Sequence, residues 1–81
     1  MIKVVFFAQT RELVGVGELS LDANFSNVEL LRQHLAEQSD KWQLALESDQ
    51  LLVAINQEIA NFDSQVNDGD EVAFFPPVTG G

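Results

Sequence analysis

The chain has 81 residues, 46% of them hydrophobic, a net charge of −9 and no cysteine. This length and composition predict one small globular domain, and they exclude disulfides, thiolate metal sites and cysteine nucleophiles. A surface this acidic repels phosphates, so we expect no nucleic-acid partner, whereas a basic protein partner is easier to accommodate.

The N-terminus lacks a basic segment followed by a long apolar run, and every apolar run is too short to cross a bilayer. We therefore expect a soluble, cytoplasmic protein without a membrane partner.

Residues 2–8 alternate along the chain and predict a first strand. Lys3 shares one face of this strand with Val5 and Phe7, so that face is expected to be nearer to solvent and to expose Phe7. A short helical turn is predicted over residues 9–14, and a second strand over residues 18–21.

Ser26 and Glu29 have the spacing of a capping box, which predicts Ser26 as the N-cap of a helix over residues 27–38. Apolar residues recur behind it at helical spacing. Ser39 or Asp40 can cap a second, shorter helix, which carries Trp42 towards the core.

Further strands are predicted over residues 51–55, 58–60 and 71–75, separated by turns at residues 56–57 and 67–70. Phe75 shares a face with Glu71, as Phe7 does with Lys3. The element order predicts an α+β fold, in which one main helix covers one face of a mixed sheet and the other face stays open. Residues 1–75 would form the domain and residues 76–81 an extended, flexible tail.

Catalytic and metal-binding patterns are weak. His34 is the only histidine and lies within the predicted helix, where a structural or surface role is favoured over catalysis, and no metal site is expected. The glycines at positions 15 and 17 are too few for a phosphate-binding loop. A calcium loop centred on Gly69 fails because it would need Val66 and Phe75 as ligands.

Phe7 and Phe75 leave two interpretations open. They could pack beneath a loop or helix, as aromatic side chains usually do. Alternatively they form an apolar docking patch next to the tail, which Ile59 could join, because exposed apolar patches usually mark interaction sites.

The tail follows Phe75 and has few ways to fold locally. Pro76 and Pro77 favour an extended path, and Gly80 and Gly81 leave the terminal carboxylate uncrowded. Val78 and Thr79 are β-branched and also favour extension, so these six residues could reach about 20 Å. A frayed end is the alternative. If the tail is functional, its carboxylate is the reactive group, and it needs activation by another protein.

Three segments, IKVVFFAQTRELVG, VELLRQHLAEQ and DGDEVAFFPPVTGG, closely resemble the small, sulfur-carrying subunits of molybdopterin synthases. The similarity runs from end to end, and its most specific part is the closing segment. It implies a ubiquitin-like β-grasp fold and a sulfur carrier in molybdenum cofactor biosynthesis that is not an enzyme on its own.

The resemblance also implies a cycle. An adenylating enzyme related to ubiquitin-activating enzymes, using ATP and Mg²⁺, would activate Gly81, and a sulfur donor system would convert it to a thiocarboxylate. The tail, residues 76–80, would then enter the large catalytic subunit of a heterotetramer and pass sulfur to cyclic pyranopterin monophosphate. Phe7, Ile59 and Phe75 match apolar contact positions of such carriers, and this chain itself would bind no cofactor.

Two alternatives share the activated terminus. A carrier for thiamine synthesis would pass its sulfur to another acceptor, although such carriers are typically shorter and do not usually end in FFPPVTGG. A ubiquitin-like modifier would instead be conjugated to lysines.

Overall fold

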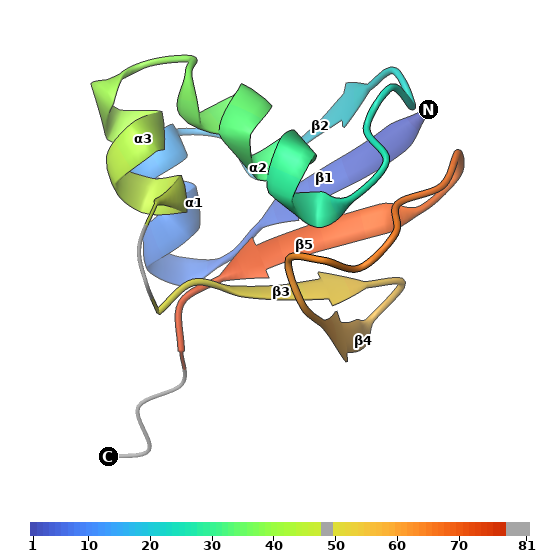
Figure 1. Ribbon diagram of the computed structural model, residues 1–81. Helices are drawn as coiled ribbons and strands as arrows, with labels where there is room; N and C mark the ends of the chain where they lie inside the picture. Colours follow the sequence, from blue (N-terminus) through green and yellow to red (C-terminus); the bar gives the residue numbers. More distant parts are fainter. Residues whose placement is uncertain (48–49, 78–81) are drawn as a thin grey trace.

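Five strands form one mixed sheet, and three helices cover one of its faces (Figure 1). The computed structural model describes residues 1–47 and 50–77. Its elements in chain order are β1 (Ile2–Phe6), α1 (Ala8–Val14), β2 (Glu18–Leu21), α2 (Val28–Ala36), α3 (Asp40–Leu46), β3 (Leu52–Ile55), β4 (Glu58–Ala60) and β5 (Glu71–Phe75).

The strand order is β2-β1-β5-β3-β4, so the last strand of the chain lies at the centre of the sheet. It pairs in parallel with β1, placing Phe6 opposite Phe74, and antiparallel with β3, placing Val53 opposite Phe74. The pairs β1–β2, joined through α1, and β3–β4, joined by a tight turn, are antiparallel. This mixed sheet with helices on one face confirms the α+β class predicted from the sequence.

The core lies between the sheet and the helices. Alternate residues of β1 and β5, such as Phe6 and Phe74, are completely buried against Leu31 and Leu46 of the helices. The ring of Trp42 meets the ring of Phe6 edge-on, with centroids 5.5 Å apart. The prediction that Trp42 faces the core is therefore confirmed.

Two predictions about local structure are wrong. The first strand ends at Phe6 rather than at residue 8, because Phe7 is the N-cap of α1 and Ala8 turns the chain with a φ of 51°. The helix α2 is capped by Asn27 rather than Ser26: the Asn27 side chain accepts a hydrogen bond from the N–H of Leu30. By contrast, Ser39 caps α3 as expected.

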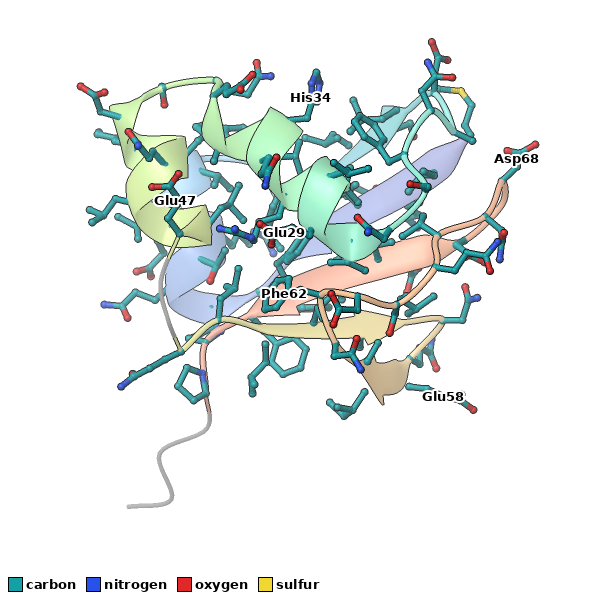
Figure 2. The ribbon with its side chains drawn as sticks, in the orientation of Figure 1. Glu29, His34, Glu47, Glu58, Phe62 and Asp68 are labelled. Atoms are coloured by element: carbon teal, nitrogen blue, oxygen red, sulfur yellow. The ribbon has the colours of Figure 1, made fainter. Side chains whose placement is uncertain are left out.

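Arg32 ties α2 to α3 and to the loop before β5. Its Nη1 donates to the carbonyl of Leu46 at 2.8 Å, and its Nε donates to the Glu29 carboxylate at 2.8 Å. The guanidinium also lies 5.5 Å from the ring centroid of Phe62. Figure 2 shows Glu29 and Phe62 close together, in agreement with the hydrogen bond from the Glu29 N–H to the Phe62 carbonyl.

Candidate functional site

The face of the sheet opposite the helices carries an apolar patch next to the root of the tail. Phe75 of β5 pairs in register with Leu52 of β3. Phe7, the residue after β1, lies on the other side of Phe75, because the N–H of Phe7 donates to the carbonyl of Phe74. Phe7 is 49% exposed, Leu52 is also exposed and Phe75 is half-buried. Because Phe7 is exposed and Phe75 is only half-buried, the docking-patch interpretation is favoured.

A second row of side chains extends this patch across four strands. Successive register pairs place Val5 beside Ala73, Ala73 beside Ala54, and Ala54 beside Ile59. The two alanines have short side chains, and Ile59 next to them has 74% of its surface exposed. We call these residues together the open-face patch; its members are Val5, Phe7, Leu52, Ala54, Ile59, Ala73 and Phe75.

Four of these members were not predicted as patch residues from the sequence. Alternation did place Val5 and Ala73 on the faces of Phe7 and Phe75, but Leu52 and Ala54 belong to a run in which both faces are apolar, so alternation does not separate its buried face from its open one. The available signal for Val5 and Ala73 was their spacing of two residues from Phe7 and Phe75 along β1 and β5.

Charged side chains border the patch at the end far from the tail. Lys3 lies between Glu18 and Glu71, with Nζ 3.1 Å and 3.8 Å from their carboxylate oxygens. The hydrogen bond to Glu18, with the negative charge of both carboxylates, raises the pKa of Lys3. Lys3 therefore offsets one of the two negative charges, and the apolar part of the face lies nearest to Phe75 and the start of the tail.

Pro76 and Pro77 continue from β5 and are half-buried. The other predicted tail residues, Val78, Thr79, Gly80 and Gly81, lie outside the described residues. The structure thus brings Phe7, Ile59 and Phe75 onto one face, beside the point from which the tail departs.

His34 is not part of this site. It is exposed on α2 and packs against the ring of Phe25, with centroids 5.1 Å apart, and Figure 2 shows it pointing away from the sheet. Within residues 1–47 and 50–77, no group of three histidine, aspartate or glutamate side chains is placed to hold a metal ion. No helix in the same residues is both long and apolar enough to span a membrane.

Comparison with known proteins identifies relatives along the whole chain. A model of the ThiS family matches residues 4–81. The molybdopterin synthase sulfur carrier subunit of Escherichia coli is 63% identical over 81 residues, which is all of both chains. That of Haemophilus influenzae is 58% identical over the same length.

Solved structures agree with this result. One is a complex of subunits 1 and 2 of the molybdopterin-converting factor from Helicobacter pylori, in which one chain is 25% identical, with a TM-score of 0.69 over 99% of this chain and 97% of that one. The small archaeal modifier protein 1 of Methanosarcina acetivorans has a TM-score of 0.81 at 24% identity, over 99% and 95% of the two chains. The predicted ubiquitin-like β-grasp fold is thereby confirmed.

Proposed function

The chain belongs to the ThiS family, and we propose that it is the sulfur carrier subunit of a molybdopterin synthase. The observation that carries this proposal is the 63% identity to the Escherichia coli carrier over the full length of both chains, residues 76–81 included. The open-face patch supports it, because a carrier that delivers its terminus into another protein needs a docking surface beside the tail.

The chemistry assigned to the tail follows from the properties of a carboxylate. At neutral pH a carboxylate resists nucleophiles, since it offers no leaving group. Transfer of the adenylyl group of ATP to the Gly81 carboxylate, with release of pyrophosphate, converts it to an acyl-adenylate. Attack by hydrosulfide released from a donor system then forms the C–S bond and expels AMP, and loss of a proton leaves a thiocarboxylate at Gly81. ATP and Mg²⁺ are bound by the adenylating partner.

The large synthase subunit supplies the catalytic residues and the binding site for cyclic pyranopterin monophosphate. This chain contributes the sulfur atom, the extended residues 76–80 that deliver it, and the open-face patch that holds the two subunits together. Two carriers and two large subunits would form the heterotetramer.

Intact-mass spectrometry tests the proposal. The chain is incubated with the adenylating enzyme, ATP, Mg²⁺ and a sulfur source, and we expect a gain in mass equal to replacing one oxygen with sulfur, located at Gly81. A chain with one residue added after Gly81 is the matched control, because it keeps the domain but converts the carboxylate of Gly81 into a peptide bond. If an active partner leaves the wild-type mass unchanged, the proposal is wrong.

The same experiment separates the alternatives. A conjugated modifier would give adducts of higher mass on lysines of other proteins. A thiamine-pathway carrier would form the thiocarboxylate but would not pass sulfur to cyclic pyranopterin monophosphate in the presence of the large synthase subunit.

A further inference from the structure

A groove lies on the other side of the tail root from the open-face patch. It has a volume of about 240 Å³ and is lined by residues of α1 and α3 and of the start of the tail. Its walls are mostly apolar, and its lining residues are Gln9, Thr10, Leu13, Leu44, Ala45, Leu51, Pro76 and Pro77. We call it the tail-root groove.

Thr10 gives this groove an unusual polar feature. Its side chain is only 3% exposed, and its hydroxyl forms no hydrogen bond with any other residue that the structure describes. Every fully enclosed side-chain nitrogen or oxygen in the described part of the chain does have a partner, so the Thr10 hydroxyl must keep a narrow opening to solvent. The groove that Thr10 lines provides that opening. Solvent in the groove can therefore hydrogen-bond the Thr10 hydroxyl, and a ligand with a hydrogen-bonding group could take the place of that solvent.

Leu44 adds an apolar contact at the edge of the groove. It is 68% exposed, the highest exposed fraction of any leucine that the structure describes. On its far side it borders a second depression, which is also lined by Asp40, Gln43 and Glu47. No lysine or arginine lines either hollow among the described residues. An occupant of this region would therefore combine an aliphatic side chain with a positive charge.

The tail-root groove and the open-face patch are formed in part by neighbouring residues of the same two segments. Leu51 lines the groove and the next residue, Leu52, belongs to the patch; likewise Phe75 belongs to the patch and Pro76 lines the groove. Consecutive residues of an extended segment point to opposite sides. Any protein that encloses the root of the tail must therefore contact both surfaces.

We propose that the tail-root groove receives a loop of the large synthase subunit, at the mouth of the channel that admits the tail. The loop places an aliphatic side chain against Leu13 and Leu44, provides a hydrogen-bonding group to the Thr10 hydroxyl, and pairs a lysine or arginine with Asp40 or Glu47. This inference rests on the proposed function, which requires the tail to enter the large subunit as far as its root.

Titration calorimetry of carrier variants against the large subunit tests the inference. Leu44→Ser removes the apolar contact and should weaken binding about tenfold. Thr10→Val keeps the shape of the side chain but removes the hydroxyl, and should weaken binding about fivefold. The melting temperature of Thr10→Val should stay the same, because the substitution breaks no hydrogen bond within the described part of the chain.

Two controls make the outcomes distinct. Leu30→Ser changes another exposed leucine, 45% exposed on α2, which lines neither the groove nor the patch and should bind as the wild type does. Ile59→Thr alters the open-face patch alone. If Ile59→Thr weakens binding while Leu44→Ser and Thr10→Val do not, the groove inference is overturned and the proposed function stands.

Other outcomes are equally decisive. If the wild-type chain itself does not bind the large subunit, the proposed function fails and the inference fails with it. If the wild-type chain forms a dimer that Leu44→Ser dissociates, without any change in affinity for the large subunit, the occupant of the groove is a second copy of the chain. If Thr10→Val lowers the melting temperature by several degrees, the Thr10 hydroxyl has a structural role. The affinity of Leu44→Ser for the large subunit then decides whether the inference holds.

Discussion

Replacing Arg32 with alanine should destabilise the domain more than any other change to a charged side chain that the structure describes. The guanidinium donates to the Leu46 carbonyl at 2.8 Å, pairs with Glu29 and lies over Phe62, and the Arg32 side chain is only 19% exposed. A charged hydrogen bond contributes about 1.5–3 kcal/mol, the partly exposed ion pair about 0.5 kcal/mol and the contact with the ring about 0.5–1 kcal/mol. We expect a loss of about 3 kcal/mol in the free energy of unfolding.

Urea unfolding followed by the fluorescence of Trp42 measures this loss. Trp42 is the only tryptophan and contacts Phe6 in the core, so its emission reports global unfolding. In a domain of this size the same loss should lower the melting temperature by roughly 12–24 °C. Lys41→Ala is the matched control, because it removes one positive charge from an exposed position on α3. A loss below about 1 kcal/mol for Arg32→Ala, or an equal loss for Lys41→Ala, would refute the reasoning.

Three further changes have expected outcomes. Ile59→Thr keeps a β-branched residue in β4 but removes exposed apolar surface, so affinity for the large subunit should fall about tenfold while the melting temperature stays the same; a fall in melting temperature alone would contradict this. Gln57→Gly should raise the free energy of unfolding by about 0.5–1 kcal/mol, because Gln57 has a φ of 71°, and lower stability in urea would show that the turn is not strained. The hydrogen bond from Arg32 lowers the pKa of Glu29, so this pair stabilises the fold above the ordinary glutamate pKa and the contribution is lost as pH falls through the lowered value. Glu29→Gln should therefore lose less stability than the wild type over that acidic range, and identical pH profiles would contradict the assignment.

Most elements could be predicted from the sequence because their signals are local. The turns at residues 56–57 and 67–70, the Ser39 cap and the alternation of β5 each depend on neighbouring residues alone. The cap of α2 depends on distant ones. Ser26 does not form a capping box with Glu29, because the N–H of Glu29 donates to the carbonyl of Phe62 and the Glu29 carboxylate accepts from Arg32.

Part of the candidate site could also be predicted from the sequence, and part of it could not. Phe7 and Phe75 could be placed on the open face because each shares it with a charged residue of its own strand. The sequence carries no comparable signal for the tail-root groove. Thr10, Leu44 and Pro76 come from three separate parts of the chain, and only the packing of α1 against α3 brings them together. The burial of Thr10 at the wall of this groove is likewise a property of packing, which residue type and spacing do not reveal.

The central position of β5 also affects how the protein is made. The strand that leads into the tail follows the other described strands in the chain, and so leaves the ribosome after both of its neighbours in the sheet, β1 and β3. A chain that stops before residue 71 lacks the middle of its sheet and cannot bury Phe6 against Phe74. Folding therefore waits for the C-terminal residues, at the cost of a slow, long-range pairing step. As a result, a molecule that reaches the native state has already been translated through residue 75, and fragments that stop earlier are left unfolded.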